Sequence, residues 1–255
     1  MNRMFMLACC LVVIVVACKE ETDQIAIDFG YAYFPLETGK YWIYQLDSIV
    51  YDPIAGGTAA DSSTLFLKEE IIGTFTDNSG DTWYKLERFT RRTPAEPWIV
   101  KDVVAMRRSE RQALRLESNL EFVKMVFPLK KGRSWDGNQF FETTLAVSVA
   151  DEPIRMFEFW EHRLVDLGTS YQLNNLSFSE VATISLADFD SRTTTLRKVE
   201  ERYAKSVGLI ERTLFILDTQ CEVCCNRNTV ACADLPWHIK AEAGFSLRQQ
   251  LIDYK

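Results

Sequence analysis

The sequence predicts a mainly β protein with a single domain, built on a curved antiparallel sheet or an incomplete barrel with few short helices. Three observations lead to this prediction. Apolar and polar residues alternate along much of the chain, turn-forming residues separate these runs, and no long segment has the period of about 3.6 residues that marks an amphipathic helix. The 255 residues are 47% hydrophobic, and no Pro-, Gly- or Ser-rich linker divides them, so we expect one folded domain over residues 31–255.

The alternation is clearest at residues 41–47, where Trp42, Tyr44 and Leu46 share one face of an extended chain. Comparable runs cover residues 83–88, 113–117 and 209–217. Turn signals separate the runs at Pro53 with Gly56-Gly57, at residues 77–81, at Thr93-Pro94 and at Asn174-Asn175. The expected short helices are placed near residues 139–150 and 178–190.

One nine-residue pattern occurs twice, 93 residues apart. Residues 34–42 read Phe-Pro-Leu-Glu-Thr-Gly-Lys-Tyr-Trp, and residues 127–135 read Phe-Pro-Leu-Lys-Lys-Gly-Arg-Ser-Trp. Because Pro restricts φ and Gly reaches conformations that other residues resist, each copy is predicted to be a tight turn that leads into a strand. We favour core packing over ligand binding for Trp42 and Trp135. Either the domain arose by duplication or one turn is used twice.

The N-terminus has the layout of a secretory signal. Arg3 beside the free amine gives a short cationic head, and the apolar run that follows is shorter than the ~20 residues that a spanning helix needs. Residues 15–18, Val-Val-Ala-Cys, resemble the lipobox that lipoprotein signal peptidase cuts. We therefore expect residues 1–17 to be a lipoprotein signal peptide, with cleavage between Ala17 and Cys18 and lipidation of Cys18.

Cys18 fits the lipobox better than the two other cysteines of this segment. Cys10 follows another cysteine where a small residue is required, and Cys9 leaves almost no apolar run before the cut. By resemblance to lipoproteins, Cys18 would carry two or three acyl chains, which anchor a protein firmly to a membrane. Residues 18–30 are then a lipidated acidic tether, and the Lys-Glu-Glu run at residues 19–21 resembles the export signal of Bacteroidetes surface lipoproteins. We expect an outer-membrane lipid anchor and favour surface exposure slightly.

Cleavage also changes the cysteine count, because seven cysteines become five and one of these is lipidated. Four remain in a Cys-rich loop at residues 221–232: Cys221, Cys224, Cys225 and Cys232. In an exported protein this cluster predicts two disulfides. The pairing is either Cys221–Cys224 with Cys225–Cys232 or Cys221–Cys225 with Cys224–Cys232, since bonding adjacent cysteines would be strained, and each small loop contributes at most about 3 kcal/mol. A four-cysteine zinc site is the competing hypothesis, although the usual two-pair spacing is absent.

The sequence contains no recognisable catalytic constellation, so we expect neither an enzyme nor a cofactor or metal site. The two histidines, His162 and His238, lack the spacing of a zinc peptidase. Neither a Gly-x-Ser-x-Gly motif nor a phosphate-binding glycine loop occurs. These motifs would have pointed to hydrolysis or nucleotide binding.

Two carboxylate sets could bind calcium, and the first could also serve a glycosidase. Asp188 and Asp190 would point the same way on a strand. Asp77, Ser79 and Asp81 have the opening spacing of a calcium loop, but the twelfth position holds Arg88, where a bidentate Glu would be required. We interpret both sets as polar turns.

The charge of the chain excludes nucleic acid as a partner. The formal net charge is −7, and it becomes −8 when the signal peptide takes Arg3 with it. Nucleic-acid binding depends on Lys and Arg that neutralise phosphates, and the most basic segment, Arg107-Arg108 with Arg111, is interrupted by Glu110. The expected partners are the membrane, through the N-terminal lipid, and other envelope proteins or glycans.

Several scattered motifs resemble a family of uncharacterised Bacteroidetes lipoproteins. They are Tyr33-Phe34-Pro35-Leu36 with Gly39, Trp42 and Tyr44, then Phe127-Pro128-Leu129 with Gly132 and Trp135-Asp136-Gly137-Asn138, then Val207-Gly208-Leu209-Ile210, and Leu251-Ile252-Asp253-Tyr254. The resemblance implies a sheet-rich extracytoplasmic domain and supplies no catalytic residues. We therefore expect a non-enzymatic binding or assembly module at the cell envelope. The alternatives are a surface hydrolase that acts on polysaccharide and a carrier of a lipid or other apolar ligand.

Overall fold

A computed structural model describes residues 28–52 and 59–255. The 3-10 helix η1 (Tyr31–Tyr33) precedes six strands: β1 (Tyr41–Asp52), β2 (Ala59–Thr76), β3 (Thr82–Arg91), β4 (Ile99–Arg108), β5 (Gln112–Glu117) and β6 (Leu120–Val126). The remaining elements are β7 (Ser134–Trp135), β8 (Val147–Val149), β9 (Glu152–Ile154), β10 (Trp160–Leu173), β11 (Leu176–Asp190), β12 (Thr195–Ala204), β13 (Gly208–Asp218), α1 (Glu222–Cys225), α2 (Thr229–Ala233), α3 (Trp237–Lys240) and β14 (Ala243–Tyr254). The predicted signal peptide (1–17), Ala17, Cys18 and the first part of the tether (18–27) lie outside the described residues.

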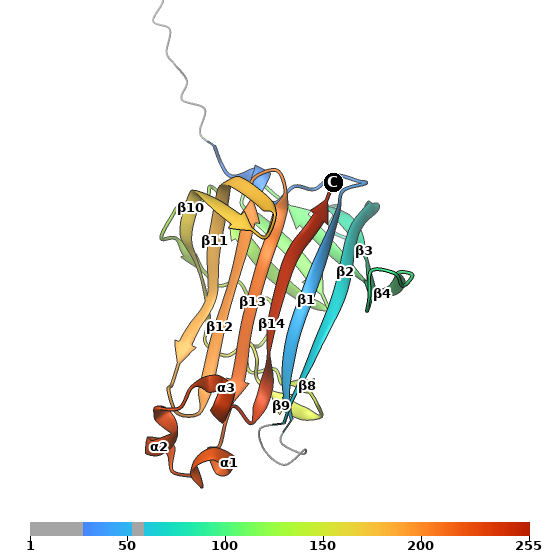
Figure 1. The fold of residues 1–255 in the computed structure, drawn as a ribbon. Coiled ribbons are helices and arrows are strands. Elements are labelled where there is room, and N and C mark those ends of the chain that lie inside the picture. Colours follow the sequence, from blue (N-terminus) through green and yellow to red (C-terminus); the bar gives the residue numbers. More distant parts are fainter. Residues whose placement is uncertain (1–27, 53–58) are drawn as a thin grey trace, which may run out of the picture.

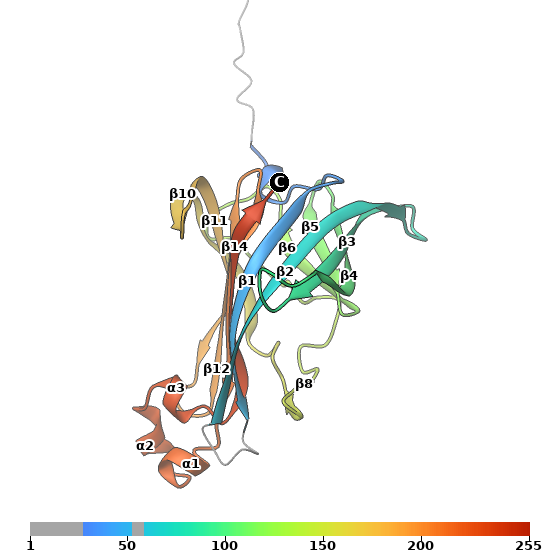
Figure 2. The same cartoon turned by 45° about the vertical axis from the view of Figure 1, so that its right-hand side comes forward.

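Twelve strands form one antiparallel sheet in the order β6-β5-β4-β3-β2-β1-β14-β13-β12-β11-β10-β7, and β8 and β9 form a separate pair. Figures 1 and 2 show that the long sheet curls round on itself. Its two edges meet where the backbone N–H of Val123 in β6 donates to the carbonyl of Gly137, just after β7 (2.8 Å). The predicted fold, a mainly β domain with a curved antiparallel sheet or incomplete barrel, is confirmed.

The sheet consists of two halves of six strands, and in each half the strands pair in the order in which they occur in the sequence. β1 to β6 are neighbours in sequence order, and so are β7 and β10 to β14; β1 then pairs with β14 to join the two halves. The repeated turns start each half in the same way. Gly39 donates its N–H to the carbonyl of Ile71 (2.8 Å), and Gly132 donates its N–H to that of Leu164 (2.7 Å).

The two acceptors of these turn hydrogen bonds are themselves 93 residues apart, the same spacing as the two turns. Both glycines have positive φ, 89° at Gly39 and 86° at Gly132, a region in which a side chain would be strained. The predicted tight turns that lead into strands are thus confirmed. Of the two alternatives left open, the shared order of six strands favours duplication over repeated use of one turn.

The tryptophans of the repeat anchor the turns, as predicted. The indole N–H of Trp42 donates to the carbonyl of Val207 (2.6 Å), and that of Trp135 donates to the carbonyl of Val123 (2.9 Å). Trp42 is buried in the main core, and Trp135 packs against it. Each indole therefore links its turn to a backbone carbonyl of a distant segment. The apolar ring packs in the core, and the single N–H group donates the hydrogen bond.

The main core fills the inside of the curled sheet. Inward-facing residues of nearly every long strand contribute to it, among them Tyr44, Leu86, Met125, Ile184 and Ile210. A smaller cluster lies on the opposite face of the sheet, where Tyr51, Leu196, Leu217 and Ala241 pack together with Trp237 of α3. The three short helices thus cover one end of the outer face, as Figure 1 shows.

The expected helices at residues 139–150 and 178–190 were wrong. Residues 139–146 have no regular structure, and residues 178–190 belong to β11. In β11 the buried positions include Phe178, Val181, Ile184 and Leu186, and two bulges displace the alternation that would have identified a strand. Within the described ranges, every helix is too short to cross a bilayer.

Candidate functional site

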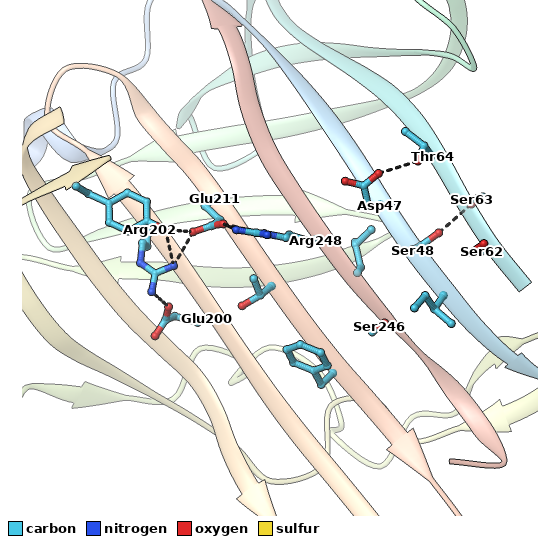
Figure 3. Close-up of a pocket in the computed structure, with 15 residues that line it drawn as sticks. Asp47, Ser48, Ser62, Ser63, Thr64, Glu200, Arg202, Glu211, Ser246 and Arg248 are labelled. Atoms are coloured by element: carbon cyan, nitrogen blue, oxygen red, sulfur yellow. Dashed lines mark hydrogen bonds and ion pairs between the residues drawn. The ribbon is translucent and has the colours of Figure 1, made fainter. Parts of the chain in front are cut away.

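A groove of about 630 Å³ runs over the outer face of the sheet, across β2, β1, β14, β13 and β12 (Figure 3). Six of its fifteen lining residues are Ser or Thr, and five are charged. The charged residues are Asp47, Glu200, Arg202, Glu211 and Arg248. Most of the lining residues are therefore polar or charged, and Phe215 and Ile49 are its exposed large apolar residues.

Strand register explains why these side chains share one face. Asp47 of β1 lies opposite Arg248 of β14, Arg248 lies opposite Thr213 of β13, and Thr213 lies opposite Glu200 of β12. Side chains alternate between the two faces of a sheet, and Leu214, next to Thr213, belongs to the core inside. The row from Asp47 to Glu200 therefore points outward. The next outward row contains Ile49, Ser246, Phe215 and Lys198.

Glu211 is the centre of the polar end of the groove. Its carboxylate accepts hydrogen bonds from the Tyr171 hydroxyl (2.6 Å), Arg202 (2.6 Å), Gln250 (2.9 Å) and Arg248 (3.2 Å). Burial opposes ionisation of Glu211, but hydrogen bonds from Tyr171, Arg202 and Gln250 outweigh it and lower its pKa. Glu211 is thus held ionised and orients two arginines toward the groove.

A second carboxylate stands close to the first. Arg202 bridges Glu211 and Glu200, since its guanidinium forms ion pairs with both. Burial raises the pKa of Glu200, although the charge of Arg202 acts in the opposite direction. The two neighbouring carboxylates therefore differ in their tendency to ionise, while Arg202 keeps them in a defined relative position.

The groove continues along the strands toward α3. A further hollow of about 370 Å³ shares Ile49, Phe215 and Ser246 with it and is lined at its far end by Trp237 and His238. Phe215, whose side chain is 44% exposed, stands between the two parts. The combined surface is long enough and open enough for an extended ligand, with hydroxyl, carboxylate and guanidinium groups along an aromatic platform.

A second cavity, of about 230 Å³, lies inside the barrel. Its lining is divided into an apolar side and a charged side. The apolar side includes Phe122, Met156, Phe157, Trp160 and Leu214, and the charged side consists of Arg115, Glu117, Lys124, Glu201 and Arg212. This volume is below the range of about 300–1,000 Å³ that is usual for small-molecule sites.

The charged side of this cavity is held by Glu201, which is 1% exposed. Its carboxylate accepts hydrogen bonds from Lys124 (2.6 Å), Arg212 (2.7 Å) and the hydroxyl of Tyr203 (2.6 Å). Burial alone would raise the pKa of Glu201, but Lys124 and Arg212 lower it to about 2. Burial also lowers the pKa of Lys124, to about 8, in spite of the attraction of Glu201.

The ion network extends across the barrel wall. Arg115 donates to Glu69 (2.5 Å) and to Glu117 (2.8 Å), and Arg88 pairs with Glu117 and with Asp102 (2.6 Å). Burial opposes ionisation of Glu117, but Arg115 and its neighbours lower its pKa well below the ordinary value. Inside the barrel, cations and anions therefore alternate, so that each buried charge lies beside one of opposite sign.

His162 and Asn138 are buried polar side chains of a different kind. Both are 1% exposed, and neither ring nitrogen of His162 and neither amide atom of Asn138 has a hydrogen-bond partner among the described residues. The His162 ring lies beside Trp135 and Trp160, with ring centres 5.8 and 5.9 Å away. It also lies against Gly137, where a Cβ atom would stand 2.2 Å from the imidazole, so only Gly fits. Burial, with the charge of Lys124, lowers the pKa of His162 to about 3.

The predicted carboxylate sets are separate from these sites or touch only their edges. Asp77 accepts backbone N–H groups of Ser79 (2.8 Å) and Asp81 (2.9 Å) and the indole N–H of Trp83, which confirms a polar turn. Asp188 and Asp190 lie in β11 and share its outer face, so the interpretation of this set as a polar turn was wrong. Asp190 accepts N–H groups from Arg192 (2.7 Å) and Trp237 (3.1 Å), whereas Asp188 pairs with Lys198 (3.8 Å).

The four cysteines of the loop are brought together, but they are free thiols in this structure. Cys221 precedes α1, Cys224 and Cys225 lie in α1, and Cys232 lies in α2. The Sγ atoms of Cys224 and Cys232 are 3.3 Å apart, where a disulfide requires about 2.05 Å. Neither of the two predicted pairings is formed, and the disulfides stay a prediction.

Sequence reasoning missed both the outer groove and the ion network. The groove residues are spread along the sequence from Asp47 to Arg248, and alternation alone marks them only as solvent-facing. One signal was present: β12 and β13 carry charges at consecutive positions, Glu200, Glu201 and Arg202 in one strand and Glu211 and Arg212 in the other. Consecutive charges on a strand place a charge on both of its faces, so one of them had to be inside.

No family model matches the chain, and no curated protein matches it. Two solved structures have a similar arrangement. The first, a protein from Bacteroides fragilis described as exported and as having a YmcC-like fold, is 9% identical over 90% of this chain and 100% of its own, with a TM-score of 0.37. The second, from Parabacteroides distasonis and described as a lipoprotein, is 10% identical over 88% of this chain and 98% of its own, with a TM-score of 0.35.

Proposed function

We propose that the folded domain is a non-enzymatic binding module that holds a glycan chain in the outer groove. The observation that carries this proposal is the groove itself, which continues from Arg202 and Glu211 past Phe215 to Trp237. Sugars offer many hydroxyl groups and apolar ring faces. A surface with fixed carboxylates and guanidiniums beside an exposed aromatic ring complements both features.

The electrostatics of the groove also favour an uncharged or weakly charged ligand. Arg202 and Arg248 are already paired with Glu211, and Asp47 accepts a hydrogen bond from Thr64 (2.7 Å). A strongly anionic or cationic ligand would have to compete with these pairs. Neutral hydroxyl groups can share the remaining donors and acceptors without separating them.

The two alternative functions are supported less well. A polysaccharide hydrolase needs a carboxyl group that can donate a proton and a second one that attacks or activates water. Both oxygen atoms of the Glu211 carboxylate instead accept hydrogen bonds, from four partners in all, and Glu200 forms an ion pair with Arg202. Neither carboxyl group is therefore available for the two roles. A lipid carrier needs a large apolar cavity, and the interior cavity of about 230 Å³ has a charged side.

In this proposal the binding module belongs to a lipoprotein of the outer membrane, anchored through Cys18 and facing the cell surface. The lipobox at residues 15–18 and the acidic tether at residues 18–30 support this arrangement. The described chain starts near η1, at the end of the barrel opposite α1–α3 (Figure 1). The tether would thus leave the helices directed away from the membrane, with the groove running from the η1 end of the barrel toward them.

We expect Cys18→Ala to abolish lipidation, because the acceptor sulfur for the diacylglycerol is lost. The measurement is metabolic labelling with a radioactive or clickable fatty acid, followed by membrane fractionation. Cys10→Ala is the matched control and should leave labelling unchanged. Continued incorporation of the fatty acid in Cys18→Ala would refute the anchor assignment.

We expect Phe215→Ala to weaken glycan binding by about 10-fold or more, because burying a Phe side chain against a ligand contributes roughly 1.5–3 kcal/mol. Binding partners are first sought on an array of defined oligosaccharides, and hits are then measured by isothermal titration calorimetry. Arg248→Ala should weaken binding as well, by removing donors beside the same platform.

The matched control for the aromatic change is Phe75→Ala. Phe75 is exposed to the same extent as Phe215 (44%) but lies on β2 away from the groove, so its loss should leave affinity unchanged. The proposal fails if no oligosaccharide binds, or if Phe75→Ala and Phe215→Ala have equal effects. Binding of a peptide instead of a sugar in the same groove would also refute the glycan assignment.

A further inference from the structure

The segment between β13 and β14 has little apolar burial to hold its shape. Its helices α1, α2 and α3 contain four, five and four residues, far fewer than an isolated helix needs in water. Several of its large apolar side chains face solvent, including Val223, Ile239 and Val230, the last of which is 79% exposed. A fold of this kind usually depends on a covalent cross-link or a bound metal.

The four cysteines are the candidates for that role. The sulfur atoms of Cys224, Cys225 and Cys232 all lie within 4.8 Å of one another. Cys224 is 3.3 Å from each of the other two, and the buried thiol of Cys221 donates to the carbonyl of Thr193 (3.6 Å). Cys221 and Cys232 are completely buried. Three thiols thus converge, and the fourth, Cys221, lies in the same stretch of twelve residues.

The number of sulfur neighbours around each cysteine distinguishes a metal site from two disulfides. In a disulfide each sulfur has one partner, at about 2.05 Å. Here Cys224 and Cys232 each have more than one sulfur neighbour, so no division into two separate pairs describes the cluster. In a tetrahedral site with metal–sulfur bonds of about 2.3 Å, the sulfur atoms are about 3.8 Å apart, close to the spacings in this cluster.

A buried cation stands beside the cluster. Lys240 is 1% exposed, and its ammonium group donates to the carbonyls of Arg192 (2.5 Å), Cys232 (3.1 Å) and Ala233 (3.5 Å). Among the described residues these three acceptors are neutral backbone groups. A zinc ion with four thiolates carries a net negative charge, so the ammonium of Lys240 would be compensated by the metal site it adjoins.

We propose that Cys221, Cys224, Cys225 and Cys232 together bind one structural zinc ion, which holds α1–α3 against the end of the sheet. Soft thiolate ligands in a tetrahedral arrangement favour zinc among the common divalent metals. The four thiols lose their protons when the metal binds, and no electron transfer is involved. This inference is independent of the proposed glycan binding.

The test uses the full-length lipidated protein, purified in detergent from envelopes without chelator or reductant. We expect about one zinc per chain by inductively coupled plasma mass spectrometry, as a four-thiolate structural site requires. After denaturation with chelator, iodoacetamide should then alkylate all four loop cysteines without any prior reduction. Cobalt exchanged for zinc should show the intense visible absorption of a tetrahedral thiolate site.

Variants locate the metal in the loop. Cys232→Ser should lower the zinc content at least about tenfold, because structural zinc sites need their full ligand set. Val230→Ser, on the same helix and exposed, is the matched control and should keep the zinc. Removal of zinc from the unmodified protein should increase hydrogen exchange in residues 221–240 while the strands stay protected, so the test does not depend on how well a variant folds.

Two results would overturn the proposal. Chains without zinc whose four cysteines resist alkylation until they are reduced would contain the two disulfides instead. Chains with four reactive thiols and no zinc would show that the cluster has neither role.

Discussion

Replacing Glu201 with Ala is expected to destabilise the protein by about 3–5 kcal/mol, the cost of removing one partner from a buried ion pair. Glu201 is the acceptor for Lys124, Arg212 and Tyr203 inside the barrel. Its loss would leave the two cations buried beside each other without their anion. Urea denaturation at pH 7 measures the change as a lower midpoint with an unchanged slope.

The control for Glu201→Ala is a surface ion pair on a neighbouring strand. Glu180 of β11 pairs with Lys205 (3.0 Å), and both side chains are partly exposed. Glu180→Ala should cost less than about 1 kcal/mol, since solvent screens such pairs. If Glu201→Ala had as small an effect, the ion network would not be a significant part of the core.

Lowering the pH from 7.5 to 5 is expected to remove about 2 kcal/mol of stability through His162 alone. Burial and the charge of Lys124 lower the pKa of His162 to about 3, whereas the ordinary value is 6.5. Between pH 3 and pH 6.5, His162 is protonated in the unfolded chain and neutral in the folded chain. The contribution of His162 to the free energy of unfolding is therefore fully present above pH 6.5. It falls by up to about 1.4 kcal/mol per pH unit as the pH drops toward 3.

The variant His162→Leu should flatten this dependence, because it removes the titrating group. The measurement is the free energy of unfolding at several pH values between 5 and 7.5, where most carboxylates stay ionised. The slope is diagnostic even if the variant has a different stability at pH 7.5. The unmodified protein, measured in parallel, is the reference for this slope. An equally steep slope in His162→Leu would disprove the assignment.

The fold class could be predicted because its signals are local. Trp42, Tyr44 and Leu46 alternate along one strand, and the turns at Gly39 and Gly132 are encoded within nine residues each. Strand pairing, in contrast, joins β1 to β14, nearly 200 residues later in the chain. The alternation of apolar and polar residues does not indicate which strands pair with each other.

The bulges show where local signals fail. In β11 the register shifts between Ser185 and Ala187, so the apolar positions no longer alternate strictly, and a helix was expected for that segment. The Cys-rich loop is a second case. Sequence spacing left disulfides and zinc open, and only the converging sulfur atoms of Cys224, Cys225 and Cys232 favour one of them.

The sequence by itself determined an antiparallel β domain, a repeated turn and an acidic chain, and it predicts a lipobox, because each of these depends on residues that are close together in the chain. The tertiary structure decided which face of each strand became the groove and which became the core. It also decided that charges could lie inside, since Arg115 meets Glu69 and Lys124 meets Glu201 across 46 and 77 residues. A buried charge is tolerated only where folding supplies its partner, and that partner is not visible from the local sequence.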